Sequence, residues 1–339
     1  MAEEGRLAQQ SWDAPAAKLV LEPIFEARFL DCSYGFRPGR SAIQALDAIR
    51  TSVETGNVFV VDADVEGFFD NLRHPQLLWL LDEHVWDPRM RKLIRQWLEA
   101  GLVYRGKREA TEKGTPQGGP ISPLLANLYL HYFDRLMEAS GHRATLVRYA
   151  DDFVVLCPSQ TAAIEVNAHI RTILGRLGLR LNEGKTRIVN LSDPKQGFDF
   201  LGYTHRLKPA TKRSTRQRLH RWPSTKAVKR IGEKIKAHLA VMAVAGMIPD
   251  AAERLSSVLR GWGAYFRWGH SRAIFSKVDN YVRRRFALCL SRIFGRKGTG
   301  WSWRTPAGEI MTIRRFLKVL GLYELSGTER PWAPAIARS

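Results

Sequence analysis

Two adjacent aspartates interrupt a largely apolar stretch near the middle of the chain. The segment from Leu146 to Leu156 reads Leu-Val-Arg-Tyr-Ala-Asp-Asp-Phe-Val-Val-Leu. Two apolar runs on either side of Ala-Asp-Asp are typical of a β-hairpin with the acids at its tip. Neighbouring like charges repel unless a cation neutralises them. Because aspartate also favours ordinary turns, the hairpin alone leaves two interpretations open: a plain turn, or part of a cation site.

A second acidic strand favours the cation site. Residues 57–65 form a β-branched and aromatic run that predicts a buried strand. Asp62 and Asp64 lie two residues apart in it and therefore point to one face of the sheet, where unpaired acids rarely survive burial. Periodicity does not decide which of the two is the ligand. We expect Asp70 to cap the helix that follows.

The basic residues gather in the C-terminal part of the chain. Of the 339 residues, 53 are Lys or Arg and 33 are Asp or Glu. Residues 1–204 contain 24 basic and 26 acidic residues, whereas residues 205–339 contain 29 and 7. This asymmetry predicts a near-neutral catalytic or structural part, followed by a part that binds a polyanion, most often nucleic acid.

The carboxylates and the basic part together predict a reaction. Oxygen ligands suit Mg²⁺, which takes substrate phosphates and waters as its other ligands. Two such ions catalyse phosphoryl transfer by lowering the pKa of the attacking hydroxyl and by stabilising the leaving group. We therefore expect two Mg²⁺ ions, held by three carboxylates from two strands, and phosphoryl transfer on nucleic acid.

Composition excludes several other classes of protein. Hydrophobic residues make up 45% of the chain, which is enough for a sizeable core. The three cysteines, Cys32, Cys157 and Cys289, lie far apart, which argues against a disulfide framework or a cysteine-based zinc site and favours the reducing cytoplasm. No run of 18 apolar residues is present and the N-terminus has no apolar signal segment, so we expect neither a membrane partner nor secretion.

Hydrophobic periodicity divides the chain into two kinds of structure. The first part mixes helices and strands without strict alternation, which favours an α+β domain; Ser41 and Gln44 there form a capping box. After Pro223 three amphipathic helices with basic outer faces predict a small bundle. Residues 205–223 are polar and basic and read as a linker or an exposed strand pair. The predicted helices of the first part are residues 41–53, 74–85, 87–100, 124–137 and 161–177, and its predicted strands are 57–65, 146–156, 187–191 and 198–204.

At this point the motifs resemble those of reverse transcriptases. Tyr149-Ala150-Asp151-Asp152 between apolar strands is similar to their active-site motif, and further blocks follow the order found in group II intron-encoded proteins. The resemblance runs from about Leu19 to the end. It rests on residues 31–41, 64–70, 114–123, 149–152, 178–186 and 200–203, and on residues 262–301, beginning with Trp-Gly-Ala-Tyr-Phe, which are similar to the thumb and maturase region.

The resemblance implies a fold and a domain order. It implies a right-hand polymerase palm with partial fingers, followed by an α-helical thumb/maturase domain. The boundaries we expect are a divergent N-terminus over 1–18, fingers remnant and palm over 19–204, a basic linker over 205–223, and a helical RNA-binding domain over 224–339.

The resemblance also implies roles for residues. Asp64, Asp151 and Asp152 would be the metal ligands and catalytic carboxylates, so that the choice between Asp62 and Asp64 follows from the resemblance alone. Phe69 resembles the steric gate that selects deoxynucleotides, with core packing as the plain alternative. Gln117 resembles a nucleotide contact. Lys185 resembles the basic residue beside the leaving pyrophosphate, with an ordinary surface lysine as the alternative. Leu201-Gly202-Tyr203 resembles the primer grip.

The basic C-terminal part then has an expected use. Its helices would hold a template–primer duplex and the cognate intron RNA, mainly through phosphates. Arg283, Arg284 and Arg285 are the candidate RNA contacts. Trp222 and Trp268 are candidates for stacking on bases, whereas Tyr265 fits the apolar stripe of its helix and is expected in the core.

The sequence departs from the family pattern in two places. The segment from Met1 to Ala17 shows nothing similar to the basic Arg-Pro-Leu-Gly-like fingers stretch, so we expect the fingers to be incomplete or to be supplied by another chain. After Gly300 no Cys/His-rich tail predicts an endonuclease domain. The main hypothesis is an RNA-directed DNA polymerase of a group II intron that uses dNTPs and assists splicing. The alternatives are a polymerase-inactive RNA-binding maturase or retroelement relic, and a host-recruited reverse transcriptase.

Overall fold

The structure is a computed structural model. It describes residues 2–99, 102–104, 107–109, 113–114, 119–210, 216–245, 248–300, 302–305 and 307–327. The chain divides into two compact units, each made of two stretches: Met1–Leu201 with Pro209–Leu219, and Gly202–Lys208 with His220–Ser339.

A four-stranded antiparallel sheet forms the centre of the first unit. Its strands are β1 (Phe59–Ala63), β4 (Thr145–Tyr149), β5 (Asp152–Cys157) and β6 (Arg187–Asn190), in the order β4-β5-β1-β6. In the two central strands, consecutive side chains are buried without exposed surface: Val60 and Val61 in β1, and Val154, Val155 and Leu156 in β5. Because successive residues of a strand face opposite sides, the sheet is covered on both faces.

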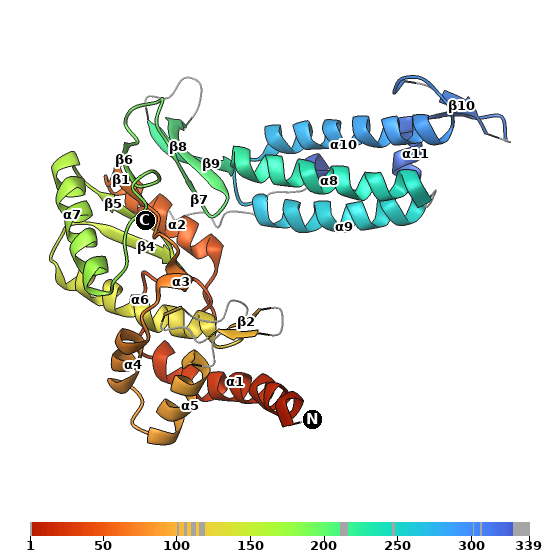
Figure 1. The fold of residues 1–339 in the computed structure, drawn as a ribbon. Coiled ribbons are helices and arrows are strands. Elements are labelled where there is room, and N and C mark those ends of the chain that lie inside the picture. The colour runs from red at the N-terminus through yellow and green to blue at the C-terminus, as the bar shows by residue number, and fades with distance from the viewer. Residues whose placement is uncertain are drawn as a thin grey trace. The chain divides into compact units, whose positions relative to one another are not determined.

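Helices cover this sheet and extend the core. Helix α2 (Ala42–Glu54) packs against β4 and β5, and α7 (Gln160–Arg176) packs against β1, β5 and β6. Helix α6 (Ser122–Ala139) packs against α7 and against α4 (His74–Asp82), which in turn contacts α5 (Pro88–Glu99). Figure 1 shows these elements. The predicted helices and strands of this part are thereby confirmed, with ends shifted by a few residues, except for the strand predicted over 198–204, which a turn at Leu201 and Gly202 divides into two.

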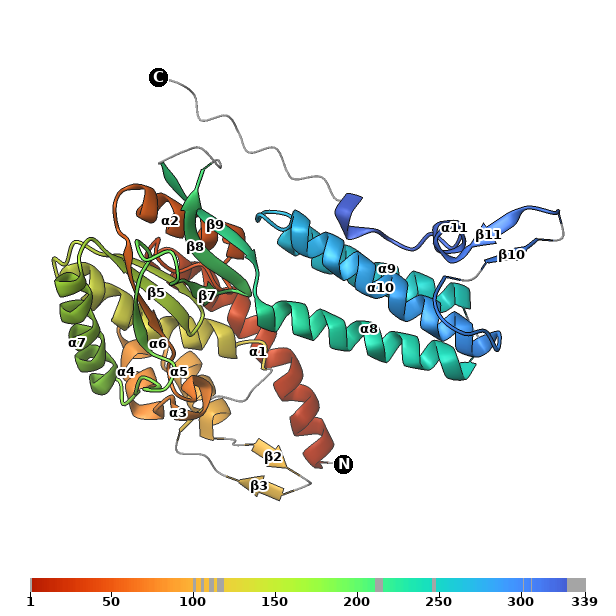
Figure 2. The ribbon, with the colours of Figure 1, turned by 90° about the horizontal axis from the view of Figure 1, so that it is seen from above.

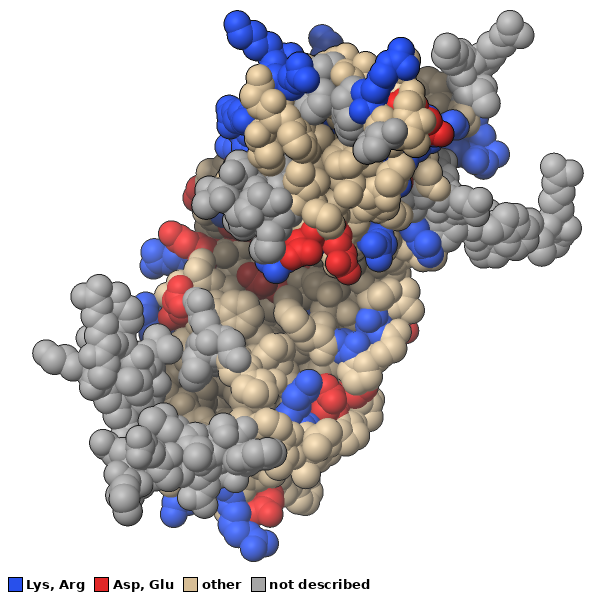
Figure 3. Space-filling view, turned by 90° about the vertical axis from the view of Figure 1, so that its right-hand side faces the viewer, with Lys and Arg blue, Asp and Glu red and all other residues tan. Residues whose placement is uncertain are grey.

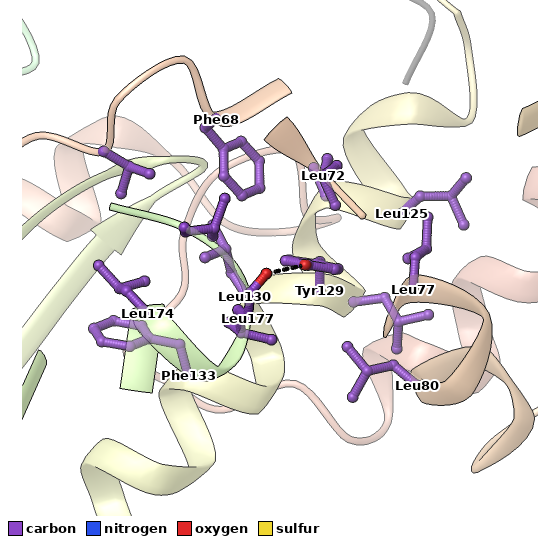
Figure 4. Packing of buried hydrophobic residues seen from close by; sticks show 14 of the residues in the cluster. Phe68, Leu72, Leu77, Leu80, Leu125, Tyr129, Leu130, Phe133, Leu174 and Leu177 are labelled. Carbon is purple, nitrogen blue, oxygen red and sulfur yellow. Dashed lines mark hydrogen bonds between the residues drawn. The ribbon is translucent and has the colours of Figure 1, made fainter. Parts of the chain in front are cut away.

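The core between α4, α6 and α7 is drawn in Figure 4. Phe68, Tyr129 and Phe133 lie among leucines from all three helices, and the Tyr129 hydroxyl donates a hydrogen bond to the Leu177 carbonyl. That bond satisfies the one polar atom of a tyrosine that is otherwise wholly buried. It also ties the end of α7 to α6.

Several elements of the first unit were not predicted. Helix α1 (Ala2–Glu26) runs through the expected boundary at residue 18, α3 (Phe68–Asn71) is a single turn, and β2 (Leu102–Tyr104) pairs with β3 (Lys107–Glu109). Asp70 lies inside α3, while Arg73 precedes α4 and gives no side-chain cap. The prediction that Asp70 caps the following helix was therefore wrong, because Asp70 belongs to the short α3 and Arg73 is the N-cap residue of α4.

The described residues between 198 and 223 form a three-stranded sheet in the order β7-β8-β9. Its strands are β7 (Phe198–Phe200), β8 (Tyr203–Pro209) and β9 (Gln217–Pro223). Over the described part of 205–223 the chain thus takes the form of a strand pair, which was one of the two expected forms.

The second unit is built on three long helices. They are α8 (Thr225–Ala245), α9 (Ile248–Phe266) and α10 (Arg272–Ile293), and they run side by side in Figure 1 and Figure 2. The described residues of the apolar faces are buried or half-buried, with Ile235, Leu255 and Phe286 fully enclosed, which confirms the bundle. Its smaller elements are β10 (Ser302–Arg304), β11 (Ile310–Thr312), α11 (Ile313–Val319) and the 3₁₀ turn Leu325–Gly327.

Candidate active site

The strand register brings the acidic segments of the first unit to one end of the sheet. Strand β1 pairs antiparallel with β5 so that Ala63 lies opposite Phe153, and β4 pairs with β5 so that Tyr149 lies opposite Asp152. The residue after Ala63 and the residue before Phe153 therefore reach the same edge. These residues are Asp64 and Asp152, and the predicted hairpin with acids at its tip is confirmed.

Asp64 is held by a lysine from the loop before β6. The Lys185 ammonium nitrogen lies 2.9 Å from Asp64 Oδ2, with 65% and 38% of the two side chains exposed. The hydrogen bond to Asp64 and its charge raise the pKa of Lys185, and the charge of Asp152 adds to the effect. Lys185 thus lies at the same edge as both carboxylates.

Asp151 is the more buried acid of the hairpin tip. Burial raises its pKa, and the negative charge of Asp64 raises it further. A carboxylate whose ionised form is disfavoured by burial and by a neighbouring carboxylate is chemically suited to bind a divalent cation, because the charge of the cation offsets both effects. The oxygen donors fit Mg²⁺ in kind. Within the described ranges, however, no three His, Cys, Asp or Glu side chains are gathered closely enough to hold a metal.

Asp62 has a different partner from Asp64. It lies opposite Arg187 in the pairing of β1 with β6, and its Oδ2 accepts a hydrogen bond of 3.1 Å from Arg187 Nε. Burial raises the pKa of Asp62, and Arg187 works against this rise. Asp62 is thus engaged in a cross-strand ion pair, whereas Asp64 lies beside the tip of the hairpin.

A buried polar network supports the hairpin tip and was missed by the sequence analysis. Arg148 and Asp134 form an ion pair whose side chains have no exposed surface, with Arg148 Nε 2.8 Å from Asp134 Oδ1. Arg148 Nη1 donates to Asn127 Oδ1 at 3.0 Å and to the Ala150 carbonyl at 2.9 Å. A charged residue inside an apolar run, Leu-Val-Arg-Tyr, was the available signal.

Burial works to lower the pKa of Arg148, but the charge and hydrogen bonds of Asp134 outweigh it and raise that pKa. Arg148 therefore stays charged inside the core, where it fixes the backbone of the tip. Ala150 at that tip has a φ of 57°, a left-handed conformation that L residues with side chains seldom adopt. The Arg148 bond to its carbonyl helps to hold this conformation.

Of the other two predicted nucleotide contacts, the structure describes Phe69 but not Gln117. Phe69 is partly buried, packs against the main core, and lies edge-on to Phe68 at 5.2 Å between ring centroids. It follows Asp64 by five residues, at the start of α3. Both the steric-gate and the core interpretation are compatible with a half-buried ring. Gln117 lies outside the described residues.

The predicted primer grip contains a tight turn and a buried ring. Leu201 and Gly202 have φ values of 48° and 78°, the pattern of a type I′ turn, and they join β7 to β8. Tyr203 is fully buried, and its hydroxyl donates to the Tyr265 carbonyl while its ring packs on Phe266. A primer contact here would therefore come from the turn rather than from the tyrosine ring.

The three predicted RNA-binding arginines point in different directions. Successive residues of a helix differ by about 100° around its axis, so Arg283, Arg284 and Arg285 do not share a face. Arg283 pairs with Glu324 at 3.6 Å, and Arg284 is the exposed one. On the face shown in Figure 3, Lys and Arg side chains are scattered singly or in small groups among other residues.

Comparisons with known proteins match both units. Residues 15–205 match the family described as reverse transcriptase (RNA-dependent DNA polymerase), and residues 228–306 match the maturase-specific domain of group II introns.

No helix in the described part of the chain is both long and apolar enough to cross a membrane.

Two curated relatives each match 57% of the chain. Protein YkfC of Escherichia coli (strain K12) is 34% identical over 229 residues, covering 57% of this chain and 59% of that protein. The group II intron-encoded protein LtrA of Lactococcus lactis subsp. cremoris is 42% identical over 256 residues, covering 57% of this chain and 42% of LtrA. The chain thus spans less than two thirds of either relative.

Among solved structures, telomerase from Candida Tropicalis in complex with the TWJ fragment of telomeric RNA matches with a TM-score of 0.48 and 15% identity. The match covers 86% of this chain and 51% of that one.

Proposed function

Because the chain belongs to the reverse transcriptase family and carries a group II intron maturase-specific domain, we propose that it is an RNA-directed DNA polymerase of a group II intron that extends a DNA primer on an RNA template with dNTPs. We propose further that it binds the intron RNA and assists its splicing. The observation that carries the first proposal is the sheet edge shared by Asp64, Asp152 and Lys185.

The residues of this edge would divide the work of nucleotidyl transfer. Asp64, Asp151 and Asp152 would hold two Mg²⁺ ions, which lower the pKa of the attacking hydroxyl and neutralise charge on the leaving group. Lys185 would release Asp64 and face the pyrophosphate, where its ammonium would offset developing negative charge. Arg148 and Asn127 would keep the hairpin tip in one conformation, so that little reorganisation accompanies the reaction.

Phe69, Gln117 and the Leu201-Gly202-Tyr203 turn complete the proposal. The ring of Phe69 would exclude a 2′-hydroxyl, Gln117 would contact the incoming nucleotide, and the turn would hold the primer backbone. In the second unit, the basic residues would bind phosphates of the duplex and of the intron RNA. Among the predicted arginines, Arg284 is the best placed because it is exposed.

The test of the polymerase is incorporation of dTTP on a poly(rA) template with an oligo(dT) primer and Mg²⁺. Asp151→Ala is expected to abolish incorporation without loss of stability, because burial already disfavours the charge of Asp151. Asp64→Asn should abolish it as well, whereas the matched variant Asp62→Asn should retain it. Equal incorporation by wild type and Asp151→Ala would overturn the catalytic assignment.

The test of nucleic-acid binding by the second unit is its dependence on salt. Binding that depends on phosphate contacts weakens steeply as the salt concentration rises. We expect the affinity of the wild-type protein for RNA to fall strongly between low and physiological salt. Arg284→Ala should weaken binding by the same factor for RNAs of different sequence. A flat salt response would contradict the role proposed for residues 205–339.

One observation favours a second candidate, an RNA-binding maturase without polymerase activity. The described residues contain no group of three His, Cys, Asp or Glu side chains that could hold a metal ion. For this candidate, purified wild-type protein should bind RNA with the same salt dependence and incorporate no dTTP. The incorporation assay separates the two candidates directly.

A further inference from the structure

Phe36 has a backbone conformation that its residue type disfavours, and an exposed ring. Its φ is 56°, a left-handed value that is a genuine outlier for a bulky side chain outside glycine. The side chain is 55% exposed, so that core packing does not explain why a phenylalanine stands here. Strained residues persist where surrounding structure fixes them, and they cluster at functional sites.

The loop around Phe36 is fixed by contacts on both sides. The Gly35 carbonyl accepts a 2.7 Å hydrogen bond from Asn127 Nδ2, in the same network that holds the Ala150 carbonyl. Gly35 lies so close to the hairpin tip that a Cβ on it would be 2.4 Å from the Ala150 nitrogen. Arg37, also buried, donates to Glu26 and to the Leu30 and Ser33 carbonyls.

The ring of Phe36 lies beside the aspartate-bearing tip. Its centroid is 6.3 Å from that of Tyr149, with 47° between the two planes. Tyr149 directly precedes the Ala150–Asp152 tip on β4, while Lys185 pairs with Asp64, which follows β1. The sheet order is β4-β5-β1-β6. Along this order the site has the aromatic rings beside β4, the aspartate carboxylates at the ends of β5 and β1, and the Lys185 ammonium group before β6.

A nucleic-acid strand has the same division of chemistry. Its phosphates are drawn to cations, whereas its bases present flat faces that stack on exposed aromatic rings. In an in-line phosphoryl transfer the attacking and leaving groups lie on opposite sides of the phosphorus. With the leaving pyrophosphate toward Lys185, the primer end and its base pair would lie toward Phe36 and Tyr149.

We propose that Phe36 is a positioning residue whose ring packs, beside Tyr149, on the terminal base pair of a bound primer–template duplex and so fixes the primer end over the carboxylates. The inference rests on the proposed polymerase function, and it adds a residue that determines where the duplex ends. It also explains the strained loop, because the left-handed backbone directs the ring outward.

The key variant is Phe36→Gly. Glycine adopts a positive φ without strain, so we expect the variant to remove the ring with little change in the stability of the fold. The matched control is Trp86→Gly, which removes an aromatic ring that is 86% exposed elsewhere in the same unit. The probe is an RNA–DNA duplex with 2-aminopurine in the template opposite the primer terminus, titrated without dNTP so that no reaction occurs.

We expect wild type and Trp86→Gly to quench the 2-aminopurine fluorescence equally. Phe36→Gly should lose most of that quenching and bind the duplex about tenfold more weakly, which equals roughly 1.4 kcal/mol at the lower end of base–aromatic stacking. Phe36→Tyr should restore both. A duplex with the probe about ten base pairs from the terminus should give the same signal with every variant, since the contact is local.

The outcomes separate this inference from the polymerase proposal. If wild type fails to incorporate dTTP but Phe36→Gly alone loses quenching, the positioning contact stands and the polymerase proposal falls. If wild type incorporates dTTP and Phe36→Gly matches it in quenching and affinity, the positioning role is overturned. Loss of folding stability in Phe36→Gly would also overturn it, because the ring would then be a structural element.

Discussion

Arg148 and Asp134 form an ion pair with no solvent exposure, and the same arginine binds the carbonyl of Ala150 at the tip of the acidic hairpin. The folding core and the candidate active site therefore share one side chain. A change that disturbs the pair should act on stability and on the site together.

The first prediction concerns this pair. Asp134→Asn should lower the free energy of unfolding by about 3–5 kcal/mol, because it leaves the Arg148 charge buried without its counterion. Urea denaturation measures the loss. The control is Glu183→Gln, which breaks an exposed ion pair with Arg171 and should change stability little. An equal loss of unfolding free energy in the two variants would contradict the prediction, because the buried charge of Arg148 would then cost no more than an exposed one.

The second prediction concerns Gly35. Gly35→Ala places a methyl group against the backbone at Ala150, so the loop or the hairpin tip must move. We expect a loss of about 1–3 kcal/mol of stability, as for other overpacked sites, and a loss of dTTP incorporation. Gly175→Ala in α7, where a Cβ meets nothing within 4 Å, should instead be neutral or stabilising. An active and stable Gly35→Ala would show that the tip tolerates displacement.

The third prediction tests Phe69. If its ring excludes the 2′-hydroxyl, Phe69→Ala should incorporate UTP as well as dTTP, whereas wild type should prefer dTTP. The assay compares the two rates on poly(rA). Phe68→Leu changes the neighbouring buried ring and should slow both reactions without altering their ratio. An unchanged ratio in Phe69→Ala would assign Phe69 to core packing.

The fourth prediction concerns acid stability. Burial lowers the pKa of His131 to about 4, from an ordinary value of 6.5. Between these two values the unfolded chain binds a proton that the folded chain does not. Stability is therefore lost as pH falls through this range, by up to about 1.4 kcal/mol per pH unit for this histidine. His205 is also buried, with its pKa lowered to about 3, and acts in the same direction.

The measurement is the free energy of unfolding at about pH 6.5 and about pH 5. His131→Leu should show a smaller loss between the two than wild type, since it has no imidazole to protonate on unfolding. The control variant His238→Gln, which changes a half-buried histidine of α8, should keep the wild-type slope. A His131→Leu variant with an unchanged slope would mean that the loss comes from other groups.

Local periodicity was enough to predict much of the fold. The capped helix after Ser41 and the hairpin around Asp151 and Asp152 formed as expected, because short-range patterns specify them. Helix α1 was not predicted because Pro15 and Pro23 lie within it, and proline usually marks the end of a helix.

The candidate site was predictable only in part. Asp64, Asp151 and Lys185 were chosen from motifs, but periodicity could not separate Asp64 from Asp62. That distinction depends on Arg187, which is distant in the sequence. The roles of Arg148 and Phe36 were not predicted for the same reason. Arg148 needs Asp134 on α6, and the strain at Phe36 depends on a backbone approach between Gly35 and Ala150.

The two units interleave along the sequence, with crossings after Leu201, after Lys208 and after Leu219. No single cut of the chain separates them. A fragment ending at residue 204 would lack the stretch 209–219 that belongs to the first unit, and a fragment starting at 224 would lack 202–208 and 220–223 of the second. Dissection by truncation would therefore yield damaged pieces, and point variants in the intact chain are the sounder way to assign activities to either unit.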